Sequence, residues 1–351
     1  MKSKKLIALF GSICLMLALA VLPFLTACAK PAPAALIELK LNESYTAKDP
    51  MTTEAYEVWA KKVEEATNGR VKVTVFPGET LSKSKEAYDS ALAGVCDIAM
   101  VPILYLAERF PLSDSMNLPV FCPTATAASR VAWELYEKLS EMKAEYSQAK
   151  LLFFYCTTPY QIHTAKKPVY TLNDLKGLQI RAAGAIDAAM MKALGATPVN
   201  ITMPEAYLAL EKGVLDGLLS PFGPMVAFKT ADVTNYHVEN ADLKSNIFAV
   251  VMNLDKWNGL PPDIRKAIDK VSGVAAAELF GTVFDGTDAP SVQYMKQKGH
   301  TFITLSPEEK ARWVEAIMPL RDKWVSDMAA KGLPGDKVLK EILRLVEKHS
   351  K

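Results

Sequence analysis

Strand-like and helix-like patterns of hydrophobic residues follow one another along most of the chain. Residues 71–76 alternate apolar and polar side chains, which predicts a half-buried strand. The largely apolar runs at 96–101 and 150–156 predict buried strands, and we expect the second to be buried on both faces. Helical periodicity over residues 52–66 and 126–148 accompanies these strands. Such alternation is typical of the α/β class, in which helices cover both faces of a mainly parallel sheet.

One short pattern occurs twice. Residues 91–101 read ALAGVCDIAMV and residues 209–219 read ALEKGVLDGLL, so that a helix end, Gly-Val, one further residue, Asp and an apolar strand follow in both. Two such units suggest two α/β lobes that face a cleft, where small ligands often bind. The helical tract from Pro261 to about Gly299, which we expect to be interrupted near Pro290, is long enough to run along both lobes.

The first residues have the pattern of an export signal, with three lysines before an apolar run from Leu6 to Leu25. The sequence at 25–28, Leu-Thr-Ala-Cys, resembles a bacterial lipobox, in which the Cys becomes the lipidated N-terminus. We therefore expect a lipoprotein signal peptide at 1–27, a Pro/Ala-rich tether at 28–35 and lipidation of Cys28. The alternative is an uncleaved transmembrane anchor, since the apolar run is long enough to span a bilayer. Both alternatives place the protein outside the cytoplasm, tethered to a membrane.

Composition limits the classes of partner. Removal of 27 of the 351 residues leaves 324, enough for about two domains. Basic and acidic residues then nearly balance, and no basic patch favours nucleic acid as a partner. Cys96, Cys122 and Cys156 remain, an odd number, so at least one thiol is free. The four histidines have no ligand-like spacing, and we expect neither a metal nor a cofactor.

One cation near the middle of the chain is a candidate for ligand binding. Residues 171–177 read as a polar turn, residues 178–182 alternate as a short strand, and Gly184 opens an amphipathic helical run. Arg181 therefore lies at the carboxyl end of a strand, just before a helix. Its guanidinium matches a carboxylate in two parallel hydrogen bonds, and the helix adds the positive end of its dipole. We expect Arg181 to anchor a carboxylate ligand; the alternative is a surface ion pair.

Seven motifs, in order and spacing, resemble the DctP-type solute receptors of tripartite ATP-independent periplasmic (TRAP) transporters. The resemblance spans almost the whole mature chain. The motifs are NGRVKVTVFPGETL (68–81), GVCDIAMV (94–101), LPVF (118–121), DLKGLQIR (174–181), LGATPV (194–199), PEAYLALEKGVLDG (204–217) and Pro-Pro-Asp (261–263).

The resemblance implies the two-lobe periplasmic-binding-protein fold, an α/β fold with a ligand cleft between the lobes and a long helix spanning both. On this plan, lobe I comprises residues 36–158 and 247–286, and lobe II comprises residues 159–246 and 287–351. The resemblance also implies a periplasmic receptor that closes around one organic acid and delivers it to separate TRAP membrane permease subunits. In the family, the Arg of the DLKGxxIR motif pairs with the ligand carboxylate, and here that residue is Arg181.

Three positions depart from the sugar-acid receptors of the family. A second Arg about twenty residues before the anchor is replaced by Gln161, beside Tyr160. An Asn after the second repeated strand is replaced by Ser220, and Phe222 follows shortly after it. The position after the first repeated strand, where the family has an acidic residue, falls at about Pro102 in this chain. Only one cationic anchor remains. We therefore expect a monocarboxylate with an apolar or aromatic body, such as an aryl or indolyl acid or a branched 2-oxo acid. A dicarboxylate or a sialic-acid-like sugar is disfavoured.

Further residues fall at pocket-lining positions of the family. They are Tyr45, Met203 and, as a weaker candidate, Asn246. Each aromatic or apolar candidate also has a structural alternative. Phe222 and Met203 could be core residues, and Tyr45 and Tyr160 could be surface rings on loops.

Two other functions have to be considered. An exported, lipid-anchored enzyme would need a catalytic motif, but the chain contains neither Gly-x-Ser-x-Gly nor His-Glu-x-x-His. A solute receptor of an ABC importer shares the two-lobe plan, but the DLKGxxIR motif and the long helix favour the TRAP type. We therefore expect a binding protein and no enzymatic activity.

Overall fold

The computed structural model describes residues 35–350. The predicted signal peptide at 1–27, Cys28 and all but the last residue of the tether at 28–35 lie outside the described residues. A boundary between residues 37 and 38 divides the chain into two units. Both predicted lobes fall almost entirely in the second unit, so their boundaries stay a prediction.

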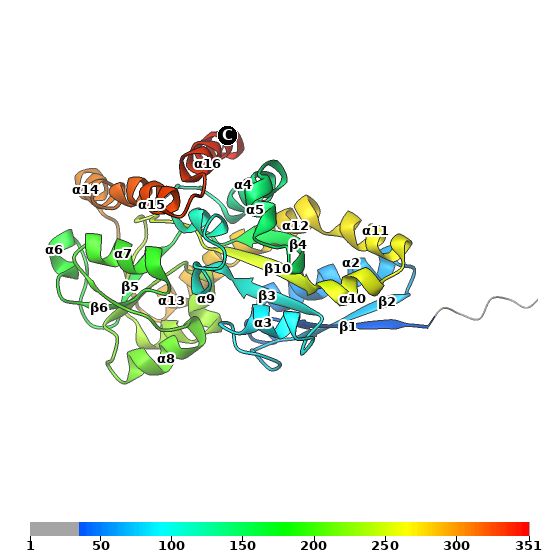
Figure 1. Ribbon diagram of the computed structural model, residues 1–351. Coiled ribbons are helices and arrows are strands. Elements are labelled where there is room, and N and C mark those ends of the chain that lie inside the picture. Colours follow the sequence, from blue (N-terminus) through cyan, green and yellow to red (C-terminus); the bar gives the residue numbers. More distant parts are fainter. Residues whose placement is uncertain (1–34, 351) are drawn as a thin grey trace, which may run out of the picture. The chain divides into compact units, whose positions relative to one another are not determined.

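The first of two sheets is mixed in direction (Figure 1). Its strand order is β2 (Val71–Phe76), β1 (Ile37–Asn42), β3 (Ile98–Pro102), β10 (Ile247–Asn253) and β4 (Ala149–Cys156). β1 pairs parallel with β3, whereas β10 lies antiparallel between β3 and β4. The sheet is therefore not mainly parallel at its centre, because the chain returns to it at β10 after building the second sheet.

Helices pack around this first sheet. They are α2 (Glu57–Ala66), which follows the π-helical turn η2 (Met51–Tyr56), α3 (Ala87–Leu92), α4 (Ala125–Lys138), α5 (Ser140–Ala144), α10 (Leu254–Gly259), α11 (Pro262–Val271), α12 (Gly273–Asp285) and α16 (Gly335–His349). The helix predicted over 126–148 is two helices, since Leu139 between α4 and α5 has an extended backbone. Short 3-10 turns, η3 (Ile103–Tyr105) and η4 (Ser113–Asn117), follow β3.

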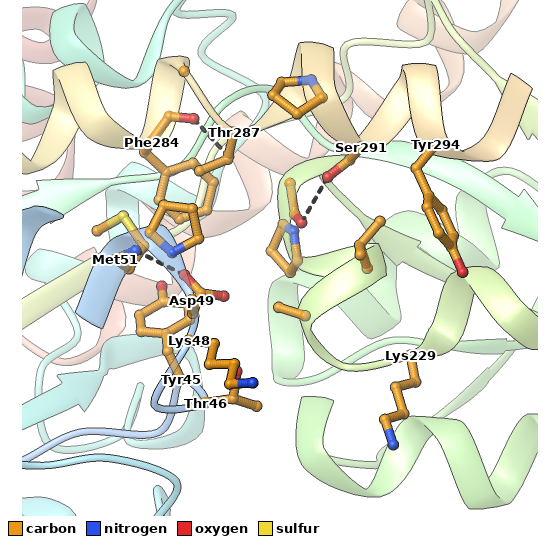
Figure 2. A pocket seen from close by; sticks show the side chains of 17 residues that line it. Tyr45, Thr46, Lys48, Asp49, Met51, Lys229, Phe284, Thr287, Ser291 and Tyr294 are labelled. Carbon is orange, nitrogen blue, oxygen red and sulfur yellow. Dashed lines mark hydrogen bonds between the residues drawn. The ribbon is translucent and has the colours of Figure 1, made fainter. Parts of the chain in front are cut away.

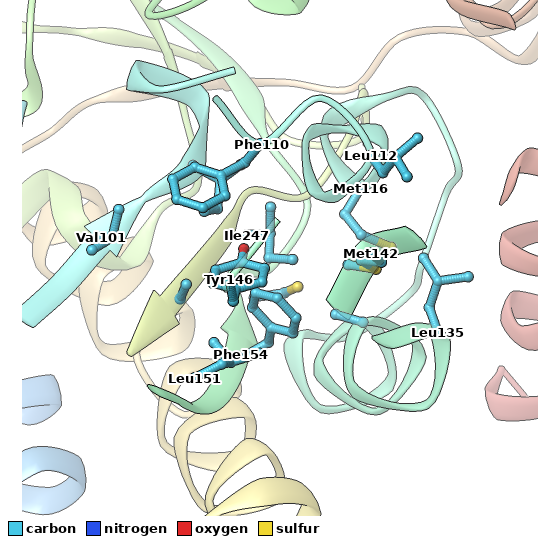
Figure 3. Packing of buried hydrophobic residues seen from close by; sticks show 14 of the residues in the cluster. Val101, Phe110, Leu112, Met116, Leu135, Met142, Tyr146, Leu151, Phe154 and Ile247 are labelled. Carbon is cyan, nitrogen blue, oxygen red and sulfur yellow. The ribbon is translucent and has the colours of Figure 1, made fainter. Parts of the chain in front are cut away.

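One apolar core lies between this sheet and its helices. Figure 3 shows Phe110, Tyr146 and Phe154 among the side chains packed near Ile247. The C-terminal helix α16 adds Val338, Leu339, Ile342 and Leu345 to the same core. Residues that the predicted boundaries assign to lobe II thus pack beside the first sheet.

The second sheet has the order β11 (Thr301–Ile303), β9 (Tyr236–Val238), β5 (Gln161–Thr164), β8 (Gly217–Ser220), β6 (Gln179–Arg181) and β7 (Thr197–Val199). β6 pairs parallel with β7 and β8, and β5 is antiparallel to β8 and β9. The remaining elements are α6 (Leu172–Leu175), α7 (Ala185–Ala193), α8 (Met203–Glu211), α9 (Gly223–Ala227), η5 (Thr230–Val233), α13 (Asp288–Gln297), α14 (Pro307–Ile317) and α15 (Pro319–Ala330).

The helical tract that follows Pro261 links the two sheets. It consists of α11, α12 and α13, with breaks at Ser272 and at residues 286–287. The interruption predicted near Pro290 is therefore misplaced, because Pro290 lies in the first turn of α13, where its missing N–H costs no helical hydrogen bond. α12 packs on α4 and β4, and α13 packs on α9, so the tract passes from the first sheet to the second.

Candidate functional site

A small cavity lies where the two sheets and their connecting segments meet. Its volume is about 50 Å³. Six of the residues predicted to contact a ligand line it: Tyr45, Tyr160, Arg181, Met203, Ser220 and Asn246. The segment 102–105 and the rings of Phe248 and Phe284 complete much of the wall. The structure thus brings together most of the predicted site from segments distant in sequence.

Arg181 is the only cation that lines this cavity within the described residues. It ends β6 and is 4% exposed. Its Nε donates to the Ile201 carbonyl oxygen at 2.9 Å and its Nη1 to the Leu219 carbonyl oxygen at 3.2 Å. In the part of the chain that the structure describes, no carboxylate pairs with it. Arg181 is therefore a buried cation held by neutral acceptors.

The local sequence explains why Arg181 points into a closed space. A capping box between Thr171 and Asp174 starts α6, and the chain then enters β6. Gly184, with φ +108°, turns the chain into α7. A Cβ atom at Gly184 would lie 2.5 Å from the carbonyl oxygen of Leu104, so only glycine allows this approach of the segment after β3.

Tyr105 is a site residue that sequence reasoning missed. It ends η3, and its hydroxyl oxygen accepts from Arg181 Nη2 at 3.4 Å and from the Met203 backbone N–H at 3.2 Å. Three of the five guanidinium N–H groups thus have partners, and two have none among the described residues. One signal in the sequence could have indicated Tyr105. It is an aromatic residue soon after the first repeated strand, three positions beyond Pro102, where a family site position was expected.

Tyr45 and Phe248, which form part of the cavity wall, pack with further aromatic side chains behind them. Tyr155 stacks on Phe248 with ring centroids 4.8 Å apart, and Tyr45 lies 6.4 Å from the same Phe248 ring. The Tyr155 hydroxyl is 3.0 Å from that of Tyr56. Below Tyr45, the buried Glu43 carboxyl accepts from the Tyr45 N–H, and burial raises the pKa of Glu43 to about 8. This wall offers apolar surface and no cation.

Asn246 carries unused polar groups at the cavity. It precedes β10 and is 1% exposed. Neither its side-chain nitrogen nor its side-chain oxygen forms a well-oriented hydrogen bond with the described residues. Buried amides are normally satisfied, so an unpaired amide that lines a cavity is well suited to meet a polar group of a ligand. The weakest sequence candidate is therefore among the better supported by geometry.

Comparison with known proteins identifies the family. A family model described as bacterial extracellular solute-binding protein, family 7 (DctP) matches residues 41–327. This chain belongs to the DctP family. The C4-dicarboxylate-binding periplasmic protein DctP of Rhodobacter capsulatus is 29% identical to it over 329 residues, which cover 92% of this chain and 94% of that protein.

Solved structures of DctP-family proteins have the same fold. The TRAP solute-binding protein from Rhodoferax ferrireducens, in complex with copurified benzoate, has a TM-score of 0.85 and 29% identity, covering 90% of this chain and 98% of that one. A marine metagenome TRAP solute-binding protein specific for aromatic acid ligands, with 3-hydroxybenzoate, has a TM-score of 0.86 and 29% identity, covering 90% and 100%. The predicted two-lobe α/β fold and TRAP receptor class are confirmed, and the protein is a solute-binding receptor, not an enzyme.

Two predicted site residues lie outside the cavity wall of this DctP-family protein. Gln161 Nε2 donates to Asp242 at 2.8 Å, and its Oε1 accepts from the Ala241 N–H at 2.8 Å, so the amide holds a turn. Phe222 packs against His163, with ring centroids 5.0 Å apart, and joins an apolar cluster. The expected ligand contacts of Gln161 and Phe222 thus have no support in the geometry, because both side chains are engaged elsewhere.

Three histidines beside the cavity form a hydrogen-bonded chain. His163 Nε2 donates to the Ser220 carbonyl oxygen at 3.0 Å, since a carbonyl can only accept. His163 Nδ1 therefore accepts from His237 Nδ1 at 2.9 Å, and His237 Nε2 accepts from His300 Nδ1 at 2.9 Å. Burial lowers the pKa of His163 to about 4 and that of His237 to about 2. The depressed pKa values of His163 and His237 favour their neutral forms, so these two buried rings add no charge beside the cavity.

The described residues contain no group of three or more His, Cys, Asp and Glu side chains placed to hold a metal ion. Cys96, Cys122 and Cys156 are all buried free thiols. Within residues 35–350, no helix is both long enough and apolar enough to cross a membrane.

Proposed function

We propose that this DctP-family receptor binds a monocarboxylate with an apolar or aromatic body and delivers it to TRAP permease subunits. One observation carries the proposal: Arg181 is a buried cation with free donors and no carboxylate partner among the described residues. A buried charge without a counter-ion is costly, so a carboxylate that enters the cavity supplies what Arg181 lacks. The empty cleft is then more stable open and hydrated, and the acid favours closure.

The relatives narrow the class of acid. Proteins with 29% identity hold benzoate and 3-hydroxybenzoate. The Rhodobacter relative is named for C4-dicarboxylates, but a second carboxylate would need a second cation. No lysine and no arginine other than Arg181 lines this cavity in the described part of the chain. Its walls are instead rich in aromatic rings, which favour an aryl or other apolar body.

The test is the melting temperature of the chain from residue 29 onward, refolded to remove any bound ligand, against benzoate, 3-hydroxybenzoate, succinate and glucuronate. A ligand at about a hundred times its dissociation constant adds roughly 2.7 kcal/mol, which is a shift of a few degrees. We expect the aromatic monocarboxylates to raise the melting temperature and Arg181→Ala to abolish the effect.

Arg321→Ala is the matched control. Arg321, like Arg181, donates to a backbone carbonyl, here that of Pro119, but it does not line the cavity. The variant should keep the full response. A response to succinate or glucuronate alone would overturn the predicted acid class, and a response that survives Arg181→Ala would overturn the anchor.

The receptor would act at the outer face of a membrane, held by lipidated Cys28. This part of the proposal depends on the lipobox-like sequence at 25–28. In cells that express the full chain, the protein should be recovered with membranes, and Cys28→Ser should release it or leave its signal uncleaved. Equal recovery of both proteins in the soluble fraction would contradict the tether.

A further inference from the structure

A second, larger pocket adjoins the cavity that contains Arg181. Its volume is about 510 Å³. Three residues line both spaces: Tyr45, Pro224 and Phe284. Figure 2 shows Tyr45 and Phe284 on one side of this outer pocket, with Ser291 and Tyr294 of α13 on another. The outer pocket and the cavity that contains Arg181 therefore share part of their walls.

The inner cavity is too small for the whole ligand that the proposed function requires. A cavity that holds benzene measures roughly 150 Å³, whereas the space at Arg181 measures about 50 Å³. A carboxylate group fits there, but a ring attached to it has to extend beyond the inner walls. The direction in which room exists is across Tyr45 and Phe284 into the outer pocket.

The lining of the outer pocket suits an apolar body. Met51, Val226, Ala227 and Pro290 supply apolar surface. Three of the polar side chains there are already engaged: Asp49 accepts from the Met51 N–H at 2.7 Å, Ser291 donates to the Gly223 carbonyl oxygen at 3.1 Å, and Tyr294 donates to Asp232 at 2.9 Å. An apolar group placed among them would break no hydrogen bond.

The charge of the outer pocket suits the approach of an anion. Lys48 and Lys229 both line it, and Figure 2 shows that they come from opposite walls. Both are exposed, and neither forms an ion pair within the described residues. Burial raises the pKa of Asp49, the acid in the same lining, to about 6. Two free lysines would attract an acid that enters with its carboxylate leading.

We propose that the ligand is an elongated monocarboxylate, with its carboxylate at Arg181 and an apolar body larger than one ring in the outer pocket. This inference rests on the proposed function, because it takes Arg181 as the anchor. It adds the prediction that the receptor prefers longer acids to shorter ones. Acids of the arylbutanoate or biaryl type should bind more tightly than benzoate, since they bury more apolar surface without losing the contact with Arg181.

The experiment is isothermal titration of the refolded receptor with benzoate, 3-phenylpropanoate, 4-phenylbutanoate and biphenyl-4-carboxylate. We expect at least tenfold tighter binding for the two longest acids than for benzoate. Ala227→Trp should fill the outer pocket, because Ala227 lines only that space and ends α9. This variant should lose the preference for the long acids, so that their affinities fall at least tenfold toward that of benzoate.

Ala330→Trp is the control, since Ala330 also ends a helix, α15, but is exposed and lines neither space. It should change neither affinity. Tightest binding of benzoate by the wild type, or an Ala227→Trp variant that still prefers the long acids, would overturn the length preference alone. If no acid of the series binds the wild type, the proposed function falls together with this inference.

Discussion

Two buried cations of this protein differ in what surrounds them. The Lys244 side chain is fully buried and pairs with Asp187, whose side chain is 2% exposed. The Lys244 ammonium also lies 4.9 Å from the centroid of the Tyr160 ring and 3.4 Å from the Asn117 oxygen. Arg181 is nearly as buried but contacts only carbonyl and hydroxyl oxygens. Among the described residues, the protein thus neutralises one internal cation and leaves the other without a counter-ion.

The histidines show a third way to bury a base. His163 and His237 are fully buried, and their depressed pKa values keep them neutral. An imidazole can give up its proton at a modest cost, whereas a guanidinium stays charged. Arg181 therefore keeps its charge, and the described residues that it contacts supply only neutral oxygen acceptors. This difference is the physical basis for treating Lys244 as structural and Arg181 as a binding group.

The largest expected change in stability comes from breaking the pair between Lys244 and Asp187. Lys244→Met leaves the Asp187 carboxylate buried without a partner, so the free energy of unfolding at pH 7 should fall by about 3–5 kcal/mol. Without ligand, Arg181→Met should change it by no more than about 1 kcal/mol, since relief from burying a charge offsets the lost hydrogen bonds. Urea denaturation of the ligand-free protein measures both.

Two controls accompany this prediction. Lys323→Met removes an exposed pair with Asp327, and exposed pairs contribute at most about 1 kcal/mol. The double variant Lys244→Met, Asp187→Leu should recover most of the loss, because neither member of the pair is then left buried without the other. Equal losses in Lys244→Met and Arg181→Met would show that the two cations have the same role, and the comparison would be wrong.

Local signals made part of this fold predictable. The alternation over 71–76 became β2 without change. Thr202 and Glu205 form the capping box that their three-residue spacing indicates, and this box starts α8. Arg181 was found because its setting, a strand end before a turn and a helix, lies within one short segment. Each of these features depends on neighbours in sequence.

Contacts between distant segments were not predictable in the same way. Tyr105 reaches Arg181 across 76 residues, and Lys244 meets Asp187 although nothing in either local sequence indicates a partner. His163 and His237 lie opposite each other because β5 pairs with β9 in one register. Gln161 was chosen by counting along the chain, and counting cannot show that its amide is already bonded to residues 241 and 242.

The smaller expected effect concerns the contact that encloses Arg181. A Cβ atom at Gly184 would collide with the Leu104 carbonyl oxygen, so Gly184→Ala should hold the segment after β3 away from Arg181. If closure around the acid requires this contact, the affinity for an aromatic acid should fall about tenfold, or roughly 1.4 kcal/mol. Small-angle scattering should show that the acid compacts the wild type more than the variant.

The control for this prediction separates closure from backbone strain. Gly213 has φ +70° and would place no atom within 4 Å of a new Cβ, so Gly213→Ala carries the strain of a left-handed backbone without the collision. It should lower stability to a similar extent and leave the affinity within about twofold. An affinity loss that is the same in both variants would mean that general strain, and not the approach of Leu104, weakens binding. In that case, the contact between Arg181 and the acid would not depend on closure of the segment after β3.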